Sequence, residues 1–202
     1  MALAKTKTPR TGRRRGVSSS QEQILEAARE LFLQRGYEGA TLRAIAKKAG
    51  VDASLIVHFF GNKVGLFAAA IEWPHDPDVE IPKLLRDGRG RVGHNLVGLL
   101  VGTWDREGGR NPILTMIRAS MAEPEIADLL RNFLRERLYA PLFEALGSDR
   151  PDLRSNLLAT QMIGLGMIRY VQRFEPLASA NPADVIAWVG PSAQRYLTGK
   201  LD

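Results

Sequence analysis

The sequence predicts an all-α protein with a small N-terminal and a larger C-terminal helical domain. Apolar residues recur along most of the chain at the three- and four-residue spacing of amphipathic helices, and no alternating pattern of strand length interrupts them. A proline-rich segment, WPHDPDVEIPK at positions 73–83, separates two groups of such patterns, because prolines at this density break helices. We therefore expect about nine helices, in domains at residues 18–73 and 74–202, preceded by a disordered arm at residues 1–17.

The first helix is predicted within SSSQEQILEAARELFLQRGYEG. Ser19 followed by Glu22 fits a capping box, in which each side chain accepts a hydrogen bond from the other residue's free backbone N–H. Gly36 is the expected left-handed stop. The apolar stripe of this helix consists of Ile24, Ala28, Leu31 and Phe32.

Two short helices joined by a glycine-containing turn follow the first one. Thr41 can cap the helix LRAIAKKA, which ends at Gly50, and Asp52 can cap the next helix, ASLIVHFF. Asn62 can cap a fourth helix. The turn of about three residues between the second and third helices predicts a helix-turn-helix.

The C-terminal group consists of longer apolar-faced helices. Pro141 and Pro191 should kink the helices that contain them, since proline removes a backbone donor. The expected helical segments are the stripe at 96–104, a helix from Pro112 to Met121, and the patterns 124–146, 153–174 and 185–197.

Charge is distributed unevenly along the chain. Residues 1–63 contain 12 Lys and Arg against 5 Asp and Glu, whereas residues 64–202 contain 16 against 17, so all of the +6 excess lies in the first third. A local basic excess attracts polyanions, because neutralised phosphates release condensed counterions. Six of these charges precede any folded pattern, so a solubilising tail explains them equally well.

Composition excludes several classes of site. The chain has no cysteine, which excludes a disulfide framework, a thiolate metal site and a cysteine nucleophile. No apolar run approaches the roughly 18–20 residues of a membrane helix. His58, His75 and His94 do not cluster with carboxylates at metal-ligand spacing, apart from HDPD at 75–78, which reads as a solvated loop. We expect no metal, no cofactor and no catalytic residue.

The N-terminal pattern resembles the DNA-binding domain of the tetracycline-repressor (TetR) family. The resemblance covers roughly residues 21–71 and rests on the framework A…LF…GY…T…IA..AGV, the segment HFFGNK and the helix after it. The C-terminal part is similar only in its plan of helices. The resemblance implies a cytoplasmic, nucleoid-associated homodimeric transcription regulator, most often a repressor. The family's third helix enters the major groove of a palindromic operator, and a ligand in the C-terminal domain changes operator affinity.

The third helix has two faces if it runs from Ala53 to Phe60. Ala53, Ile56 and Phe60 share the face expected to pack on the first two helices, with Val57 beside it. Ser54 and His58 share another face, flanked by Leu55 and Phe59, which is the one a groove would meet. We expect the DNA contacts to come from Thr41, Arg43, Ser54, Leu55, His58, Phe59 and Lys63.

Several polar and basic residues of this region can also be explained without DNA. His58 could be a hydrogen-bonded surface histidine, Thr41 is an N-cap whether or not it holds a phosphate, and Lys47 and Lys48 fit a solvated face.

Three positions of this segment depart from the family. Val57 and Phe59 stand where the family often has hydrogen-bonding side chains, and Asp52 stands where it often has Ser or Thr. Phosphate contacts made through hydroxyls at the first two positions cannot be transferred to this chain. The charge of Asp52 would oppose a nearby phosphate. The basic arm can offset this loss by lying along phosphates or in the minor groove.

The C-terminal domain is expected to bind a small, largely apolar effector and to form the dimer. For the ligand site we expect the apolar side chains Trp104, Met116, Phe133, Met162 and Tyr170, each of which fits plain core equally well. Gly164 and Gly166 inside one helix suggest close approach of another backbone or a ligand. By the resemblance, segments 153–174 and 185–197 pair with those of a second subunit. The alternative function is a small-molecule-binding or enzymatic helical protein with a vestigial DNA-binding motif.

Overall fold

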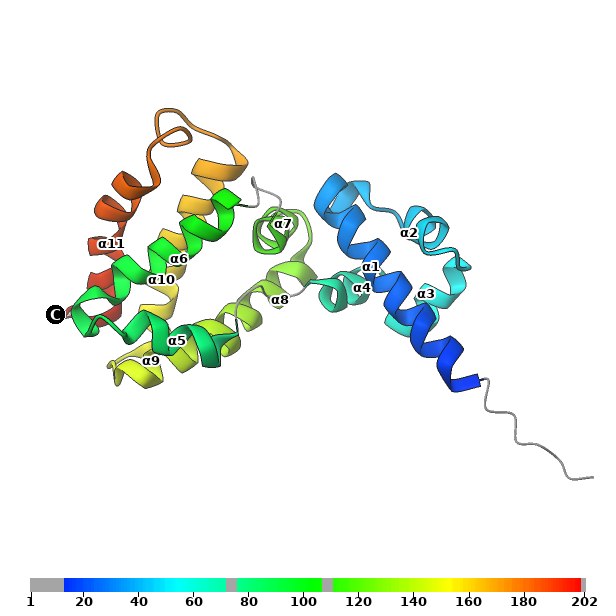
Figure 1. The fold of residues 1–202 in the computed structure, drawn as a ribbon, viewed down its shortest axis with the longest axis horizontal. Helices are drawn as coiled ribbons and strands as arrows, with labels where there is room; N and C mark the ends of the chain where they lie inside the picture. Colours follow the sequence, from blue (N-terminus) through cyan, green and yellow to red (C-terminus); the bar gives the residue numbers. More distant parts are fainter. Residues whose placement is uncertain (1–12, 72–75, 107–110, 201–202) are drawn as a thin grey trace, which may run out of the picture. The chain divides into compact units, whose positions relative to one another are not determined.

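The computed structural model describes residues 13–71, 76–106 and 111–200, and these segments are helical almost throughout (Figure 1). No strand occurs among them, which confirms the predicted all-α class. Contacts divide the chain into two compact units, Met1–Ala70 and Ile71–Asp202. Most of the expected basic arm, residues 1–12, lies outside the described segments.

The described residues of the N-terminal unit form four helices. They are α1 (Arg13–Gly39), α2 (Leu42–Ala49), α3 (Ala53–Phe60) and α4 (Lys63–Ala70). Thr41, Asp52 and Asn62 each accept a bond from a backbone N–H in the first turn of the following helix, at 3.1, 2.8 and 2.8 Å, so all three predicted caps are confirmed.

The start of α1 differs from the prediction. The helix begins at Arg13, so Ser19 lies inside it and is not an N-cap residue. Arginine is a strong helix former, and no proline separates Arg13–Arg15 from the apolar pattern, so the helix extends toward the N-terminus. The predicted stop at Gly36 is present as a kink with φ of 70° and ψ of 178°, although helical turns continue to Gly39.

An aromatic cluster fixes α4 against α1. The ring of Phe67 packs edge-on against Phe32 and Tyr37, with centroids 4.9 and 5.0 Å apart. The guanidinium Nε of Arg29 donates to the carbonyl of Ala70 at 3.2 Å, which satisfies a backbone acceptor at the end of α4. These contacts join α1 to α4, and α3 packs against α1, α2 and α4.

The C-terminal unit is longer and also helical. Its helices are α5 (Pro77–Leu85), a 3₁₀ turn (Arg89–Arg91), α6 (Val92–Arg106), α7 (Pro112–Ala119), α8 (Pro124–Phe133), α9 (Ala140–Leu146), α10 (Pro151–Leu165) and α11 (Pro182–Thr198). A π-helical stretch, Leu134–Tyr139, joins α8 to α9, and a second, Gly166–Val171, continues α10.

Three details of this unit correct the sequence predictions. The segment with Pro77 and Pro82 forms α5, because Pro77 occupies the first turn, where its missing N–H costs nothing. The helical segment predicted to reach Phe174 ends at Val171. Gly166 admits the side chains of Leu114 and Trp104, not a backbone, since a Cβ there would lie 3.1 and 3.4 Å from them.

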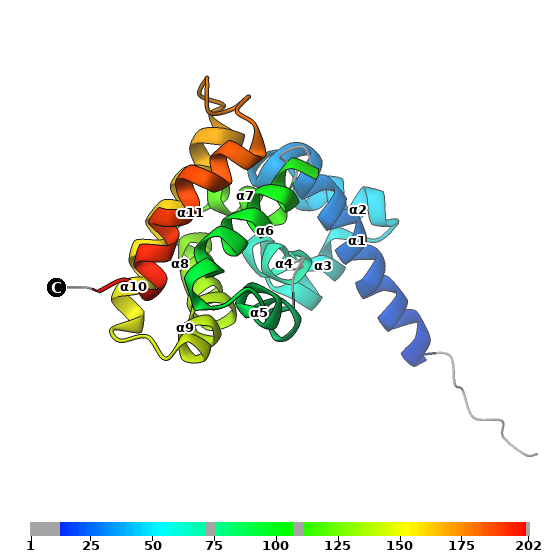
Figure 2. The same cartoon turned by 60° about the vertical axis from the view of Figure 1, so that its left-hand side comes forward.

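Helices α6 and α11 run side by side in both views of the fold (Figure 2). Their backbones meet at Gly93, where a Cβ would lie 2.4 Å from the backbone nitrogen of Gln194 and 2.5 Å from the carbonyl oxygen of Gly190. The Gln194 side chain accepts the N–H of Gly93 at 2.7 Å and donates to the carbonyl of Arg89 at 2.7 Å. It therefore joins α11 to the start of α6.

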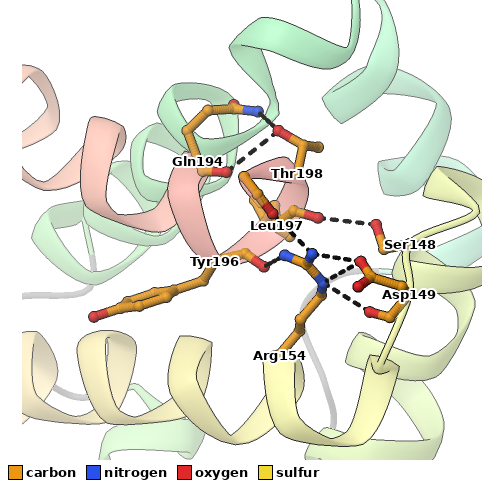
Figure 3. A network of polar contacts seen from close by, with 8 residues as sticks. Ser148, Asp149, Arg154, Gln194, Tyr196, Leu197 and Thr198 are labelled. Atoms are coloured by element: carbon orange, nitrogen blue, oxygen red, sulfur yellow. Dashed lines mark hydrogen bonds and ion pairs between the residues drawn. The ribbon is translucent and has the colours of Figure 1, made fainter. Parts of the chain in front are cut away.

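A buried arginine holds the end of α11 against the start of α10 (Figure 3). Arg154 is 2% exposed, and its guanidinium donates to the carbonyls of Tyr196 and Gly199 at 2.9 and 2.8 Å. Its other bonds go to the carbonyl and carboxylate of Asp149, at 2.7 and 2.5 Å. The cation thus satisfies carbonyls that the end of a helix otherwise leaves unpaired.

Within the described segments no single helix is long and apolar enough to cross a membrane. Only α3 and α4 taken together, which are bent by 73° at their break, reach the required length and apolar composition.

Candidate nucleic-acid interface

A tight turn of three residues sets the angle between α2 and α3. Gly50 is left-handed, with φ of 69° and ψ of 30°, and the N–H of Val51 reaches back to the carbonyl of Ala46 at 3.0 Å. Glycine favours this conformation because a side chain there would be strained. Asp52 then begins α3 at once, which confirms the predicted helix-turn-helix.

Helix α3 buries one side and presents the other to solvent. Ile56 is fully buried, whereas Ser54, Val57 and His58 are exposed. These three positions follow the i, i+3, i+4 spacing of one helix face. Leu55 and Phe59 flank this face and are half-buried, so they can contact a partner only with their outer edges.

Two predictions about α3 are corrected by this burial pattern. Val57 was predicted to lie beside the core face of α3. It is 50% exposed and belongs to the outer face. Phe60 is only half-buried. The spacing of Val57 from Ser54 and from the exposed Gly61 is the signal that could have revealed the outer position of Val57.

Asp52 engages both polar groups of Ser54. Its carboxylate accepts the backbone N–H of Ser54 at 2.8 Å and the hydroxyl of Ser54 at 2.5 Å. These two hydrogen bonds hold the pKa of Asp52 below its usual value, so the carboxylate stays charged at neutral pH. The hydroxyl hydrogen of Ser54 is therefore not free to donate to a phosphate unless this bond breaks.

The basic side chains of α2 and α4 differ in whether they already form contacts within the protein. Lys48 pairs with Glu30 of α1 at 2.8 Å. Lys63 lies 4.2 Å from the ring centroid of Tyr37 and 3.4 Å from the carbonyl of Glu38, so part of its donor capacity is already used. Arg43 and Lys47 are exposed, and neither forms an ion pair within the described residues. Thr41 is exposed at the start of α2, where its oxygen caps Ala44.

The five apolar ligand candidates of the C-terminal unit differ in burial. Trp104, Met116 and Met162 are almost fully buried, while Phe133 and Tyr170 are half-buried. Trp104 and Tyr170 do meet, with ring centroids 5.4 Å apart.

Comparison with known families agrees with this architecture. Residues 24–70 match the family described as bacterial regulatory proteins, tetR family. Residues 90–197, more than half of the chain, match the family described as tetracyclin repressor-like, C-terminal domain. The chain belongs to the tetR family. The resemblance recognised in the N-terminal third is thereby confirmed and extended to the C-terminal unit.

Solved structures of bacterial regulators share the fold. A TetR-family regulator from Streptomyces coelicolor A3 is 35% identical, with a TM-score of 0.59 over 92% of this chain and 98% of that one. NalD of Pseudomonas aeruginosa, a secondary repressor of a multidrug efflux pump, is 20% identical and shows the fold alone, with a TM-score of 0.55 over 91% of this chain and 99% of its own.

Curated HTH-type regulators match over shorter segments. The transcriptional repressor AcnR of Corynebacterium glutamicum is 44% identical over 52 residues, which cover 26% of this chain. The matched segment spans 28% of AcnR, so the similarity concerns only a small part of either protein. The transcriptional regulator UidR of Escherichia coli K12 is 25% identical over 149 residues, covering 70% of this chain and 75% of UidR.

Proposed function

We propose that this tetR-family chain is a sequence-specific DNA-binding transcriptional regulator that represses genes beside its operator. The observation that carries the proposal is the outer face of α3, where Ser54, Val57 and His58 are exposed on a helix held at a fixed angle by a three-residue turn. A short, rigid helix with small and polar exposed side chains fits the major groove. This role requires no catalysis.

The exposed groups divide into base contacts and phosphate contacts. His58 can donate to guanine acceptors, and Val57 with the edges of Leu55 and Phe59 can touch thymine methyl groups. Arg43 supplies a free cation for phosphates, and Lys63 adds a partly engaged one. Thr41 lies at the N-terminus of α2, where free N–H groups favour an anion.

We assign dimerisation to α10 and α11 and effector binding to the C-terminal unit. The exposed apolar side chains Leu153 and Trp188, 39% and 73% exposed, lie on these two helices and support the assignment. A symmetric dimer would read a palindromic operator whose half-sites are about 34–36 Å apart, or a multiple of that distance.

The proposal is tested by selecting bound sequences from a random DNA pool with the full chain. A palindromic consensus is expected, and its affinity should fall steeply with salt because phosphate contacts release counterions. The variant His58→Ala should lose specificity, whereas Arg43→Ala should weaken binding to all sequences alike. The matched control is Arg118→Ala, which removes an exposed arginine from the C-terminal unit and should leave the consensus unchanged.

Two outcomes would contradict the proposal. Equal binding to all sequences would point to an architectural protein without specific readout. No DNA binding at low salt would favour a helical small-molecule-binding protein or enzyme with a vestigial motif.

A further inference from the structure

A cavity of about 440 Å³ opens between the α8–π stretch and α10 in the C-terminal unit. A second hollow of about 260 Å³ adjoins it, and the two share Arg135, Asp152 and Ser155. The larger one is floored by apolar side chains and contains none of the five ligand candidates named from the sequence. Its apolar lining is Ala127, Leu130, Leu134, Ala159 and Ile163.

Two buried hydroxyl groups reach this cavity without a partner. Tyr139 is 3% exposed and Ser155 is 8% exposed, and both residues line the cavity. Neither hydroxyl forms a hydrogen bond within the described part of the chain, yet neither is among its fully enclosed unpaired polar atoms. Both residues line the cavity, and Ser155 also lines the adjoining hollow, so a group bound there can pair their hydroxyls.

Local backbone geometry accounts for the position of Tyr139 in the lining of this cavity. Pro141 has no N–H, and its ring would clash with the carbonyl four residues earlier in a regular α-helix. The chain widens into the π-helical stretch Leu134–Tyr139 just before it. Such π-turns recur at functional sites, where they redirect a side chain.

The charges at the rim do not demand an ionic ligand. Arg131 pairs with Asp128, and Arg135 pairs with Glu136 at 3.1 Å, so each cation is already balanced. Burial raises the pKa of the Tyr139 hydroxyl, which therefore remains a protonated hydrogen-bond donor at neutral pH. Asp152 and Asn156 also line the cavity, from exposed positions at its rim. The two hydroxyls are the buried hydrogen-bonding groups that it offers above its apolar floor.

We propose that this cavity is the effector site, and that it takes a medium-sized apolar molecule bearing an acceptor oxygen that Tyr139 and Ser155 hydrogen-bond. A carbonyl and a carboxylate oxygen share this chemistry. The inference deepens the proposed function and rests on it for its regulatory meaning, because binding here would act on a DNA-binding regulator. The ligand binding itself can be measured without DNA.

The test titrates the full chain with 2-decanone and with decanoate, a neutral and an anionic acceptor on similar apolar chains, and with decylamine, which offers no acceptor oxygen. Calorimetry should show binding of at least one acceptor probe and none of decylamine. Tyr139→Phe and Ser155→Ala should each weaken binding about three- to tenfold, the effect of one lost hydrogen bond. Ala159→Phe, which fills the cavity, should abolish it.

Tyr196→Phe is the matched control, because it removes a tyrosine hydroxyl outside the cavity lining and should bind like the wild type. Thermal unfolding with and without probe verifies that each variant is folded and reports binding a second time. No binding of either acceptor probe, or binding unchanged in Tyr139→Phe and Ala159→Phe, overturns the assignment. Affinity of the same variants for selected DNA is measured separately, so failure of the ligand site is distinguishable from failure of DNA binding.

Discussion

At the scale of single residues, Asp52 combines a favourable and an unfavourable role. Its carboxylate caps α3 through the N–H of Ser54, which stabilises the helix that we propose enters the groove. The same carboxylate stays charged, because its hydrogen bonds to Ser54 lower its pKa. A fixed negative charge at this point opposes the phosphates that DNA would bring close. We therefore expect this residue to stabilise the fold and to lower the affinity for DNA.

Replacing Asp52 with asparagine separates the two roles. Asparagine caps helices as well as aspartate does but carries no charge. We expect Asp52→Asn to retain the wild-type unfolding midpoint and to bind the selected operator roughly two- to fivefold more tightly at low salt. Fluorescence anisotropy at two salt concentrations measures this change. Asp52→Ser is a second capping control, and weaker binding by both variants would show that the carboxylate makes a favourable contact.

The contact between Arg154 and Asp149 makes stability depend on pH. The guanidinium holds the pKa of Asp149 below its ordinary value of 3.8, so the charged pair stabilises the fold fully above that pH and loses its effect as the pH falls through the lower folded-state value. Asp149→Asn should therefore be less stable than the wild type at pH 7 and equally stable near pH 2. Urea unfolding across this range measures the difference. A difference that does not change with pH would show that the charge of Asp149 contributes nothing.

At the scale of helices, the crossing of α6 and α11 depends on the absence of a side chain. Gly93 lets the backbone of one helix touch that of the other, and the Gln194 side chain ties the two together at the same point. Gly98, on the same helix, has more room, since a Cβ there would lie at an ordinary 3.7 Å from the side chain of Ile186. Substitution by alanine should therefore lower the free energy of unfolding at Gly93 but not at Gly98.

Gly93→Ala is expected to lower the free energy of unfolding by roughly 1–3 kcal/mol or more, because its methyl group overlaps a backbone that cannot move aside. Gly98→Ala should be neutral or stabilising by up to about 1 kcal/mol, since alanine favours helix. Urea denaturation of both variants supplies the comparison. Equal stability of the two would contradict the close crossing.

Sequence reasoning predicted those features of the helices that depend on local chemistry. The caps at Thr41, Asp52 and Asn62 and the turn at Gly50 were predictable, because each satisfies backbone groups within a few residues. The cavity was not, because the position of Tyr139 depends on a widened turn and on the packing of α10.

The contacts of Arg154 and the position of Val57 could not be predicted from local sequence patterns. The network of Arg154 joins residues more than 40 positions apart, which no local pattern reveals. Val57 was misplaced because a short apolar run fits two rotations of one helix equally well.

At the scale of the whole molecule, the chain has two compact units of different charge, between which we propose that function is divided. The basic excess lies in residues 1–63, whereas the rest of the chain is close to neutral. The C-terminal unit carries the exposed tryptophan Trp188 on α11. Large aromatic side chains exposed on a helix are the usual anchors of protein interfaces, which is why we place the dimer contact there.

Trp188→Ala should weaken the dimer roughly 30-fold or more, which corresponds to the loss of about 2 kcal/mol from a central aromatic anchor. Sedimentation equilibrium over a range of protein concentrations measures the dissociation constant. Met121→Ala is the matched control, because Met121 is also well exposed, at 67%, but lies after α7. A wild-type chain that remains monomeric throughout would remove the dimer from the proposal.

The hydrogen bond from the Ser54 hydroxyl to Asp52 restricts the operator sequence itself. Because its hydrogen is committed to the carboxylate, this hydroxyl meets DNA only through its oxygen lone pairs. In the major groove, amino groups that can donate to such an oxygen are carried by adenine at N6 and cytosine at N4. The base that Ser54 contacts in each half-site is therefore expected to be adenine or cytosine. In this way Asp52, the residue that caps α3, restricts the base at that position of the operator.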